Sequence, residues 1–333
     1  MAEARDDLEA RADRLYKDAL VWDDHSGFDP QPNADLEYLR LWTDAGVDYL
    51  SIDVGYDVMD WRTSLRSLAA FRAWLLARPR TYTLVDRAAD VWRAKREGTL
   101  AVTFDLEGMN ALDGNVDMVD VYYELGVRQM LFAYNRNNLA GGGCHDDDVG
   151  LTDFGRAVVR AMNRVGMMVD CSHSAHCTTM EAMEASTDPV IFSHSNAWGL
   201  CRHGRNIKDD QINACAATGG VIGINGLGLF LGDNDISSER FVDHVAYMAD
   251  LVGPDHVGIA LDYAFEVDGL ENILSAHPDF WPRNEYPGGP ARFVPPGQLR
   301  EIAATMLRRG FSEIEARGVL GENFLRVASQ VWK

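Results

Sequence analysis

The chain alternates short runs of apolar, β-prone residues with longer stretches of helical spacing, and this alternation constrains the fold most. The apolar runs cover residues 19–25, 49–55, 99–108, 128–135, 167–173, 189–195, 220–226 and 256–263. Several of the helical stretches end at a glycine just before the next run: Gly46, Gly98, Gly126, Gly166 and Gly219. Glycine readily adopts the left-handed conformation that closes many helices. Eight such units in about 250 residues predict an α/β fold, a (β/α)8 barrel of the TIM type.

The same pattern favours one domain. The 333 residues contain no internal repeat, no low-complexity tract and no linker. A doubly wound open sheet is the alternative, but no G-x-G-x-x-G motif follows the first run. We therefore expect residues 1–333 to form a single barrel domain, with a surface helix before the first strand and two helices after the last. The Pro- and Gly-rich segment 277–298 is expected to be a long loop that acts as a lid.

Charge and composition exclude several classes of partner. The formal net charge is −20 and hydrophobic residues make up 47% of the chain. A surface this acidic repels nucleic acid and anionic membranes, so neither is expected as a partner, and a homo-oligomer stays open. No apolar run has the length of a signal peptide or a membrane span. The five cysteines are scattered and include no CxxC pair, which favours reduced thiols and a cytoplasmic location.

Polar residues with metal-binding chemistry stand where the predicted strands end. They are His25, Glu107, His173, His194 and Asp262, with Tyr134 near the end of the fourth strand. The carboxyl ends of the strands of a (β/α)8 barrel meet at one mouth, where its chemistry is done. Taken singly, each residue has an ordinary structural explanation as a loop or capping residue. Together, imidazoles joined by a carboxylate predict a site for Zn²⁺ or a similar first-row ion.

The other histidines lack such a pattern, and we expect them to be structural or exposed: His145, His176, His203, His244, His256 and His277.

These residues lie in motifs that resemble the membrane (renal) dipeptidase family of the amidohydrolase superfamily. The motifs are DDH at 23–25, LEG at 106–108, LTDFGRAVVRAMNRVGMMVDCSH at 151–173, DPVIFSHSNA at 188–197, GRNIKDD at 204–210, HVGIALD at 256–262 and VLGENFLRV at 319–327. The resemblance runs from about residue 19 to 328. It implies a barrel with a metal site in which activated water attacks an amide carbonyl.

The resemblance also implies a role for each residue. Glu107 would bridge the metals, His173 and His194 would bind one ion, and His25 the other. Asp262 would carry the proton from the attacking water to the leaving amine. Arg205, with Asn206 beside it, would hold the carboxylate of the substrate, and Tyr134 would line the substrate site.

The chain departs from the family pattern at three points. The usual His-x-Asp of the first strand reads His25-Ser26-Gly27, so one carboxylate ligand is missing, and neither Asp23 nor Asp29 is an assured substitute. The family histidine of the fourth strand is Tyr134. The Gly-Asp-Phe-Asp-Gly of the eighth strand keeps only its first aspartate, Asp262. We therefore expect one zinc ion bound firmly by Glu107, His173 and His194, and a weak or empty site at His25.

The leading hypothesis is a metal-dependent, dipeptidase-like hydrolase of a small carboxylate-bearing amide. Within it, a dipeptidase and a non-peptide amidohydrolase are both open. A catalytically inactive metal- or ligand-binding homologue, which binds without turnover, is a second hypothesis. A metal-dependent lyase or isomerase is a third, and the mass of the product distinguishes it from a hydrolase.

Overall fold

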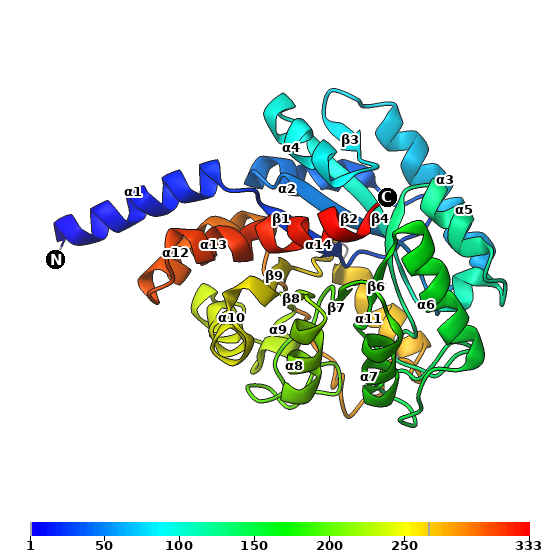
Figure 1. Cartoon of the computed structure of the whole chain (residues 1–333). Coiled ribbons are helices and arrows are strands. Elements are labelled where there is room, and N and C mark those ends of the chain that lie inside the picture. Colours follow the sequence, from blue (N-terminus) through cyan, green and yellow to red (C-terminus); the bar gives the residue numbers. More distant parts are fainter. Residues whose placement is uncertain (1, 266) are drawn as a thin grey trace.

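The strands form a curled parallel sheet with helices on its outside (Figure 1). The computed structural model describes residues 2–265 and 267–333, without the side chains of residues 2–7 and 267–271. The strands are β1 (Trp22–Ser26), β2 (Tyr49–Tyr56), β3 (Tyr82–Leu84), β4 (Leu100–Glu107), β5 (Val127–Leu131), β6 (Met168–Asp170), β7 (Val190–Ile191), β8 (Ile222–Asn225) and β9 (Val257–Ala260). One sheet has the order β1-β2-β4-β5-β6-β7 with β3 paired to the start of β4, and β8 pairs with β9.

The helices follow the strands along the chain and cover the sheet. They are α1 (Ala2–Asp18), α2 (Arg40–Ala45), α3 (Trp61–Leu76), α4 (Ala88–Glu97), α5 (Met118–Glu124), α6 (Asp153–Val165), α7 (His176–Ala185), α8 (Asp209–Ala217), α9 (Gly228–Leu231), α10 (Ser238–Val252), α11 (Val267–Ala276), α12 (Leu299–Arg308), α13 (Glu313–Arg317) and α14 (Asn323–Val331). Helix α1 extends outward beside α12 and α13 (Figure 1). An Arg11–Glu313 ion pair of 3.0 Å connects α1 to α13.

Each of the eight predicted apolar runs contains one observed strand, namely β1, β2 and β4–β9. The five glycines expected at helix ends all have positive φ. Regular pairing stops between β7 and β8 and between β9 and β1, where single backbone hydrogen bonds bridge the gaps. These bonds run from Phe192 N to Val221 O (3.1 Å), Gly223 N to Phe192 O (2.8 Å), Asp262 N to His25 O (3.1 Å) and Gly27 N to Tyr263 O (3.2 Å). The fold is thus a mixed α/β fold with a curled parallel sheet.

Two predictions about the elements were wrong. The stretch between the second and third predicted strands is more than one long helix, because β3 and α4 follow α3. The chain after the last strand forms four helices, α11–α14, where two were expected. Ser312 starts α13 with a capping box, its side chain accepting a hydrogen bond from Glu315 N at 3.2 Å. The capping box thus starts a new helix, α13, shortly after α12 ends at Arg308.

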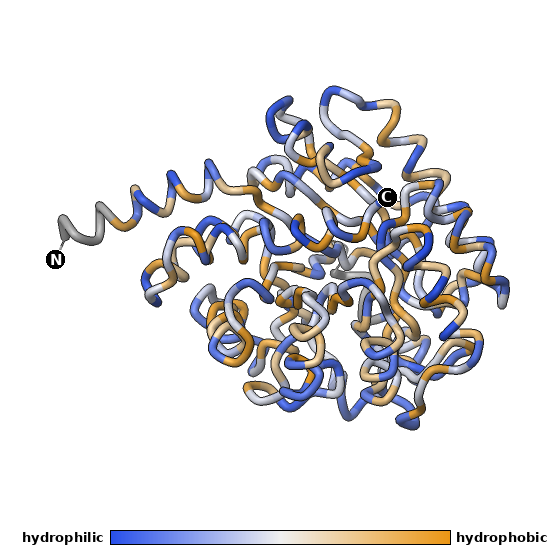
Figure 2. The backbone as a smooth tube through the Cα atoms, viewed as in Figure 1, coloured by the Kyte–Doolittle hydropathy of each residue, from blue (hydrophilic) through white to orange (hydrophobic). Residues whose placement is uncertain are grey.

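The interior is apolar and the helices are amphipathic. Hydrophobic and hydrophilic segments alternate along most helices in Figure 2, as expected for helices that lie on a core. In α6, for example, Val158, Val159 and Met162 are buried, and Thr152 caps the helix by accepting a hydrogen bond from Gly155 N. A second apolar cluster, which includes Trp22 and Phe324, closes the amino-terminal end of the strands.

The segment 277–298 contains no regular helix or strand except a 3-10 turn at Pro296–Gln298. It is attached to the rest of the chain by specific contacts. Asn135 Nδ2 donates to Phe280 O at 3.0 Å, and His145 Nε2 lies 3.1 Å from the Tyr286 hydroxyl. The segment therefore lies over the carboxyl ends of the strands, where the lid was expected.

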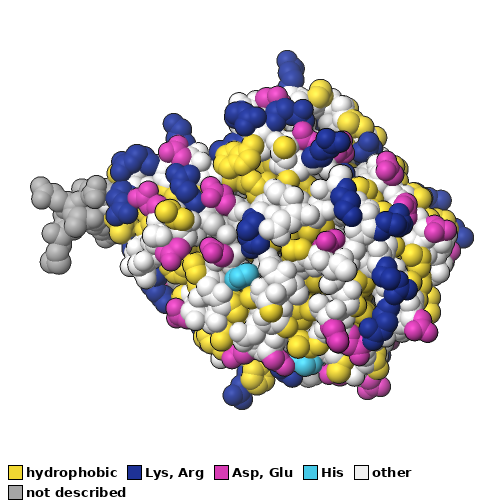
Figure 3. Space-filling view, in the orientation of Figure 1, with side chains coloured by type: hydrophobic (Ala, Val, Ile, Leu, Met, Phe, Trp, Pro, Cys, Tyr) yellow, Lys and Arg dark blue, Asp and Glu magenta, His cyan; other side chains and the backbone are white. Residues whose placement is uncertain are grey.

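Basic and acidic side chains are interspersed on the face shown in Figure 3. Among the described helices, none combines the length and the apolar character needed to cross a membrane.

Candidate metal centre

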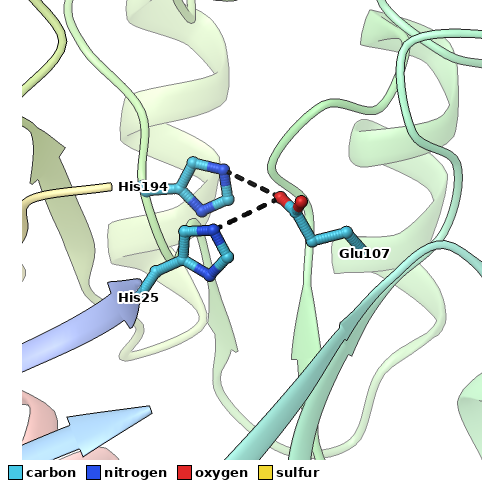
Figure 4. A group of neighbouring side chains, drawn as sticks. All are labelled: His25, Glu107 and His194. Carbon is cyan, nitrogen blue, oxygen red and sulfur yellow. Dashed lines mark ion pairs between the residues drawn. The ribbon is translucent and has the colours of Figure 1, made fainter. Parts of the chain in front are cut away.

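Three imidazoles converge on one carboxylate oxygen at the carboxyl ends of the strands. The Oε1 atom of Glu107, the last residue of β4, lies 3.2 Å from Nε2 of His173, 3.3 Å from Nε2 of His194 and 3.5 Å from Nε2 of His25. The Nε2 atoms of His173 and His194 are 2.9 Å apart. Figure 4 shows His25 and His194 facing Glu107 from separate elements. Residues predicted from four strand ends are therefore brought together.

The opposite nitrogen of each imidazole is held by an acceptor. His173 Nδ1 lies 2.7 Å from Asn135 Oδ1, and His25 Nδ1 lies 3.0 Å from Asp105 Oδ1. His194 Nδ1 lies 2.7 Å from Ser193 Oγ, whose own proton is donated to Asp170. Amide oxygens and carboxylates only accept hydrogen bonds, so each Nδ1 carries a proton, and the neutral His173 and His194 present their Nε2 lone pairs to Glu107. This is the arrangement that orients histidines as metal ligands.

Local hydrogen bonds place the two histidines that follow β6 and β7. The carboxylate of Asp170 accepts hydrogen bonds from the backbone nitrogens of Ser172 and Ser193, both at 2.9 Å. These nitrogens are thus satisfied by a side chain, and the chain leaves the strands just before His173 and His194. His173, Asn135 and Asp262 all have positive φ, at 61°, 61° and 52°. Such strained conformations in residues other than glycine concentrate at functional sites.

Burial controls the protonation of this group. Burial, and then the positive charge of Arg205, lowers the pKa of His173 well below its usual range. Burial likewise lowers the pKa of His194, and it raises the pKa of Glu107. Burial also disfavours the charged form of His25, but the carboxylates of Asp105 and Glu107 outweigh it and raise the pKa of His25 well above normal. The neutral imidazoles of His173 and His194, beside several carboxylates, form a donor set whose negative charge a divalent cation would compensate.

One further observation indicates that these side chains suit a first-row metal ion. Glu107 Oε1 is buried and has no hydrogen-bond partner among the described residues. A buried carboxylate oxygen without a partner is costly, and three imidazole Nε2 atoms lie within 3.5 Å of it. His25, Glu107 and His194, without His173, form one of the two groups in the described chain whose ligand atoms lie close enough to share a metal ion. The other group, Asp148, His176 and Cys177, is partly exposed.

Gly27 and Asp262 explain the altered first-strand motif. A Cβ atom on Gly27 would lie 2.1 Å from Asp262 Oδ1 and 2.3 Å from Asp262 O. Asp262 Oδ1 is 3.6 Å from His25 Nε2, and Asn225 donates to its Oδ2 at 2.8 Å. The backbone and carboxylate of Asp262 therefore occupy the space that a side chain at position 27 would need.

The two aspartates weighed as substitutes are bonded to other groups, although Asp29 lines the small cavity that also contains Glu107 and Asp262. Asp23 accepts hydrogen bonds from Trp42 Nε1 and Leu261 N, both at 2.7 Å. Asp29 lies within 3.4 Å of side-chain donors of Gln31 and Tyr56.

Two carboxylates that sequence reasoning missed lie beside His25. Asp105 holds its Nδ1, and Asp53 is paired with Asp105 in the register of β2 and β4. Asp53 lines a small cavity together with Glu107 and Asp262. A signal was present, because Asp105 stands two residues before Glu107 and strand side chains alternate between faces.

Two of the three predicted substrate residues, Arg205 and Asn206, line a polar cavity of about 230 Å³ next to His173, and Tyr134 lines a separate cavity that also reaches His173. Arg205 is 2% exposed, donates from Nη2 to His194 O at 3.1 Å, and has an Nε without a partner among the described residues. Asn206 lines the same cavity, but its Nδ2 is bonded to Cys201 O and Phe230 O. Tyr134 stacks on His173, with ring centroids 4.1 Å apart.

The remaining histidines have other partners. His176 pairs with Asp210 at 2.7 Å, His244 contacts Ala197 N and Leu231 O, and His256 contacts Gly220 O. His203 has more influence on the site than expected, because its Nδ1 accepts a hydrogen bond from Arg205 N at 3.1 Å. His145 lies close to Tyr286 of the lid segment.

Comparisons with known proteins agree with this geometry. The model of the family described as membrane dipeptidase (peptidase family M19) matches residues 31–280, so His25 lies outside the matched range. Dipeptidase tcpJ of Claviceps purpurea (strain 20.1) is 31% identical over 257 residues, which cover 74% of this chain and 55% of that protein. The chain thus spans about half the length of this curated relative.

Solved structures show the same fold. An amidohydrolase from Pseudomonas aeruginosa superposes with a TM-score of 0.88 at 27% identity, covering 96% of this chain and 99% of that one. A metallo peptidase from Rhodobacter sphaeroides, solved with a phosphinate mimic of the dipeptide L-Ala-D-Ala, gives 0.75 at 20% identity, covering 95% and 100%. Because the family model matches most of its residues, the chain belongs to the membrane dipeptidase family, peptidase family M19.

Proposed function

We propose that this chain is a metal-dependent hydrolase of small amides that carry a carboxylate, with dipeptides as the first class to test. The observation that carries the proposal is the convergence of three imidazole Nε2 atoms on the unpartnered Oε1 atom of Glu107. Membership of a dipeptidase family supports the reaction class. A non-peptide amide is the alternative substrate within the same chemistry.

Glu107, His173 and His194 would hold a zinc ion, with His25 beside them. When bound, such an ion supplies Lewis-acid chemistry that activates water and polarises a carbonyl. We keep the proposal of one firmly bound ion, since Gly27 offers no carboxylate on the His25 side.

Asp262 is placed to move the proton. Its Oδ1 faces His25 while Asn225 fixes its Oδ2, and burial raises its pKa. In the reaction, hydroxide from water would add to the amide carbon, Asp262 would take the remaining proton, and the leaving amine would receive it when the C–N bond breaks.

Arg205 would orient the substrate. Its guanidinium is buried beside the metal centre, and its Nε lacks a partner among the described residues. A substrate carboxylate would satisfy that donor and hold the amide over Glu107.

The same proposal includes a closed barrel in a single domain of residues 1–333. The hydrogen bonds between β7 and β8 and between β9 and β1 support closure, because they continue the strand order into a ring.

The test is a metal and activity assay on protein purified without chelators. Dipeptides and their C-terminal amides form the panel, and His173→Ala is compared with His256→Ala, whose histidine contacts Gly220 O before β9 and belongs to neither metal group. We expect metal affinity to fall by at least about 100-fold in His173→Ala only, because a direct ligand is lost. Wild type should hydrolyse dipeptides faster than their amides. Equal metal content in the two variants, or no turnover by metal-loaded wild type, would contradict the proposal.

A further inference from the structure

We propose that the preferred substrate is a dipeptide whose amino-terminal residue has a bulky apolar side chain, which enters an apolar chamber beside the metal centre. This inference rests on the proposed function and adds the substrate class. The chamber is a cavity of about 250 Å³ formed by α9, α11 and the lid segment, and its apolar wall consists of Leu227, Leu229, Phe230, Leu274, Trp281 and Phe293.

The wall of the chamber belongs to an apolar cluster distinct from the core under the helices. Phe230, Trp281 and Tyr286 are its buried members, and Leu229 and Leu274 pack against them. Binding of an apolar group in such a cavity is favourable, because the group displaces water from apolar side chains. A cavity of about 150 Å³ lined in this way accommodates benzene, so this chamber has room for a leucine or phenylalanine side chain.

The chamber opens onto the reacting groups. Its lining also includes Gly27, Tyr134, His173 and Asp262. Asp262 is the one carboxylate among the described residues that line it, and it lies at the end near His25. A charged side chain in the apolar part would therefore be desolvated without a partner, which is costly.

Tyr134, which stands where the family has a histidine, adds to the aromatic wall of the chamber. The Tyr134 ring lies edge-on to Trp281, with centroids 5.7 Å apart, and edge-on to Tyr56 at 5.4 Å. It thus joins the aromatic wall to His173, on which it stacks.

The position of Arg205 fixes which end of the substrate enters the chamber. Arg205 lies in the polar cavity, and its Cζ is 5.4 Å from the centroid of Phe230, which lines the apolar chamber. His173 lines both cavities. A carboxylate on Arg205 therefore leaves the amide near His173 and directs the residue on the acyl side of the amide into the chamber.

The experiment measures kcat/KM for the series Gly-Gly, Ala-Gly, Leu-Gly, Phe-Gly, Glu-Gly and Lys-Gly with the metal-loaded full chain. We expect at least about a 10-fold rise from Gly-Gly to Leu-Gly or Phe-Gly, because extra methylene groups in an apolar pocket give gains of this size, and low values for Glu-Gly and Lys-Gly. Leu229→Trp fills the chamber and should lower the ratio of kcat/KM for Phe-Gly to that for Gly-Gly to about one. Leu76→Trp, on a leucine of α3 that is 57% exposed, is the control.

A cooperative melting curve shows that Leu229→Trp is folded, and Leu229→Ala serves as the second variant, with an expected weaker preference for Leu-Gly. Equal or falling rates along the apolar series, or an unchanged preference in both Leu229 variants, would overturn the inference and leave the hydrolase proposal standing. Absence of turnover for every dipeptide would instead overturn the proposed function, and this inference with it.

Discussion

At the scale of single residues, Asp105 is the least expected member of the site. From β4, with β2 between it and β1, it holds Nδ1 of His25 at 3.0 Å and accepts a second hydrogen bond from Ser51. Carboxylate partners of metal-binding histidines fix the ring and increase its basicity. We expect Asp105→Ala to weaken the second, weaker metal site at His25 by about 10–100-fold, measured by titrating a second equivalent of metal against a competing chelator, and to leave the ion at Glu107, His173 and His194 in place. Asp105→Asn keeps a hydrogen-bond acceptor for His25, so its metal affinity should fall less than that of Asp105→Ala.

A melting curve of each Asp105 variant without metal separates this effect from a loss of folding. Equal metal affinity in wild type and Asp105→Ala, both folded, would show that Asp105 does not position His25.

At the scale of elements, α10 is joined to its neighbours through one buried histidine. His244 Nδ1 accepts from Ala197 N at 3.2 Å, and its Nε2 donates to Leu231 O at 3.1 Å. Burial lowers the pKa of His244 to about 4, whereas the unfolded chain has a value of about 6.5. As the pH falls from about 6.5 to about 4, His244 is protonated in the unfolded state but stays neutral in the folded state. The free energy of unfolding should therefore decrease, by up to about 3 kcal/mol from this group.

Urea denaturation between pH 7.5 and 4 measures this effect. His244→Gln should be less stable than wild type at pH 7.5 and should lose less stability on acidification, since the titrating group is absent. Parallel pH profiles for the two proteins would assign the acid sensitivity to other groups.

At the scale of the whole molecule, the first strand meets the last at Gly27. A Cβ atom there would lie 2.3 Å from the backbone oxygen of Asp262, which cannot move without shifting the chain after β9. We expect Gly27→Ala to lower the free energy of unfolding by about 3 kcal/mol, at the upper end of the range for overpacked sites. Gly297→Ala is the control, because nothing lies within 4 Å of its Cβ position. Equal midpoints of thermal unfolding would show that the two ends of the sheet are not tightly apposed.

The sequence by itself determined the elements and the identity of the chemical groups. Apolar runs, helix-closing glycines and polar residues at strand ends are local patterns, so the positions of His25, Glu107, His173 and His194 at strand ends were predictable. The strand β3 was missed because Tyr82–Leu84 includes the polar Thr83 and closely follows a helical stretch, whereas β6 and β7, which are no longer, lie in apolar runs.

The tertiary structure decided which groups face one another. Asp105 lies 80 residues from His25, and the contact of Asp23 with Leu261 spans 238 residues. The apolar chamber likewise combines residues of α9, α11 and the lid segment. Such contacts depend on how the strands curl and where the lid packs. No local pattern encodes them, because the free energy that selects them comes from burial and hydrogen bonding between distant parts of the chain.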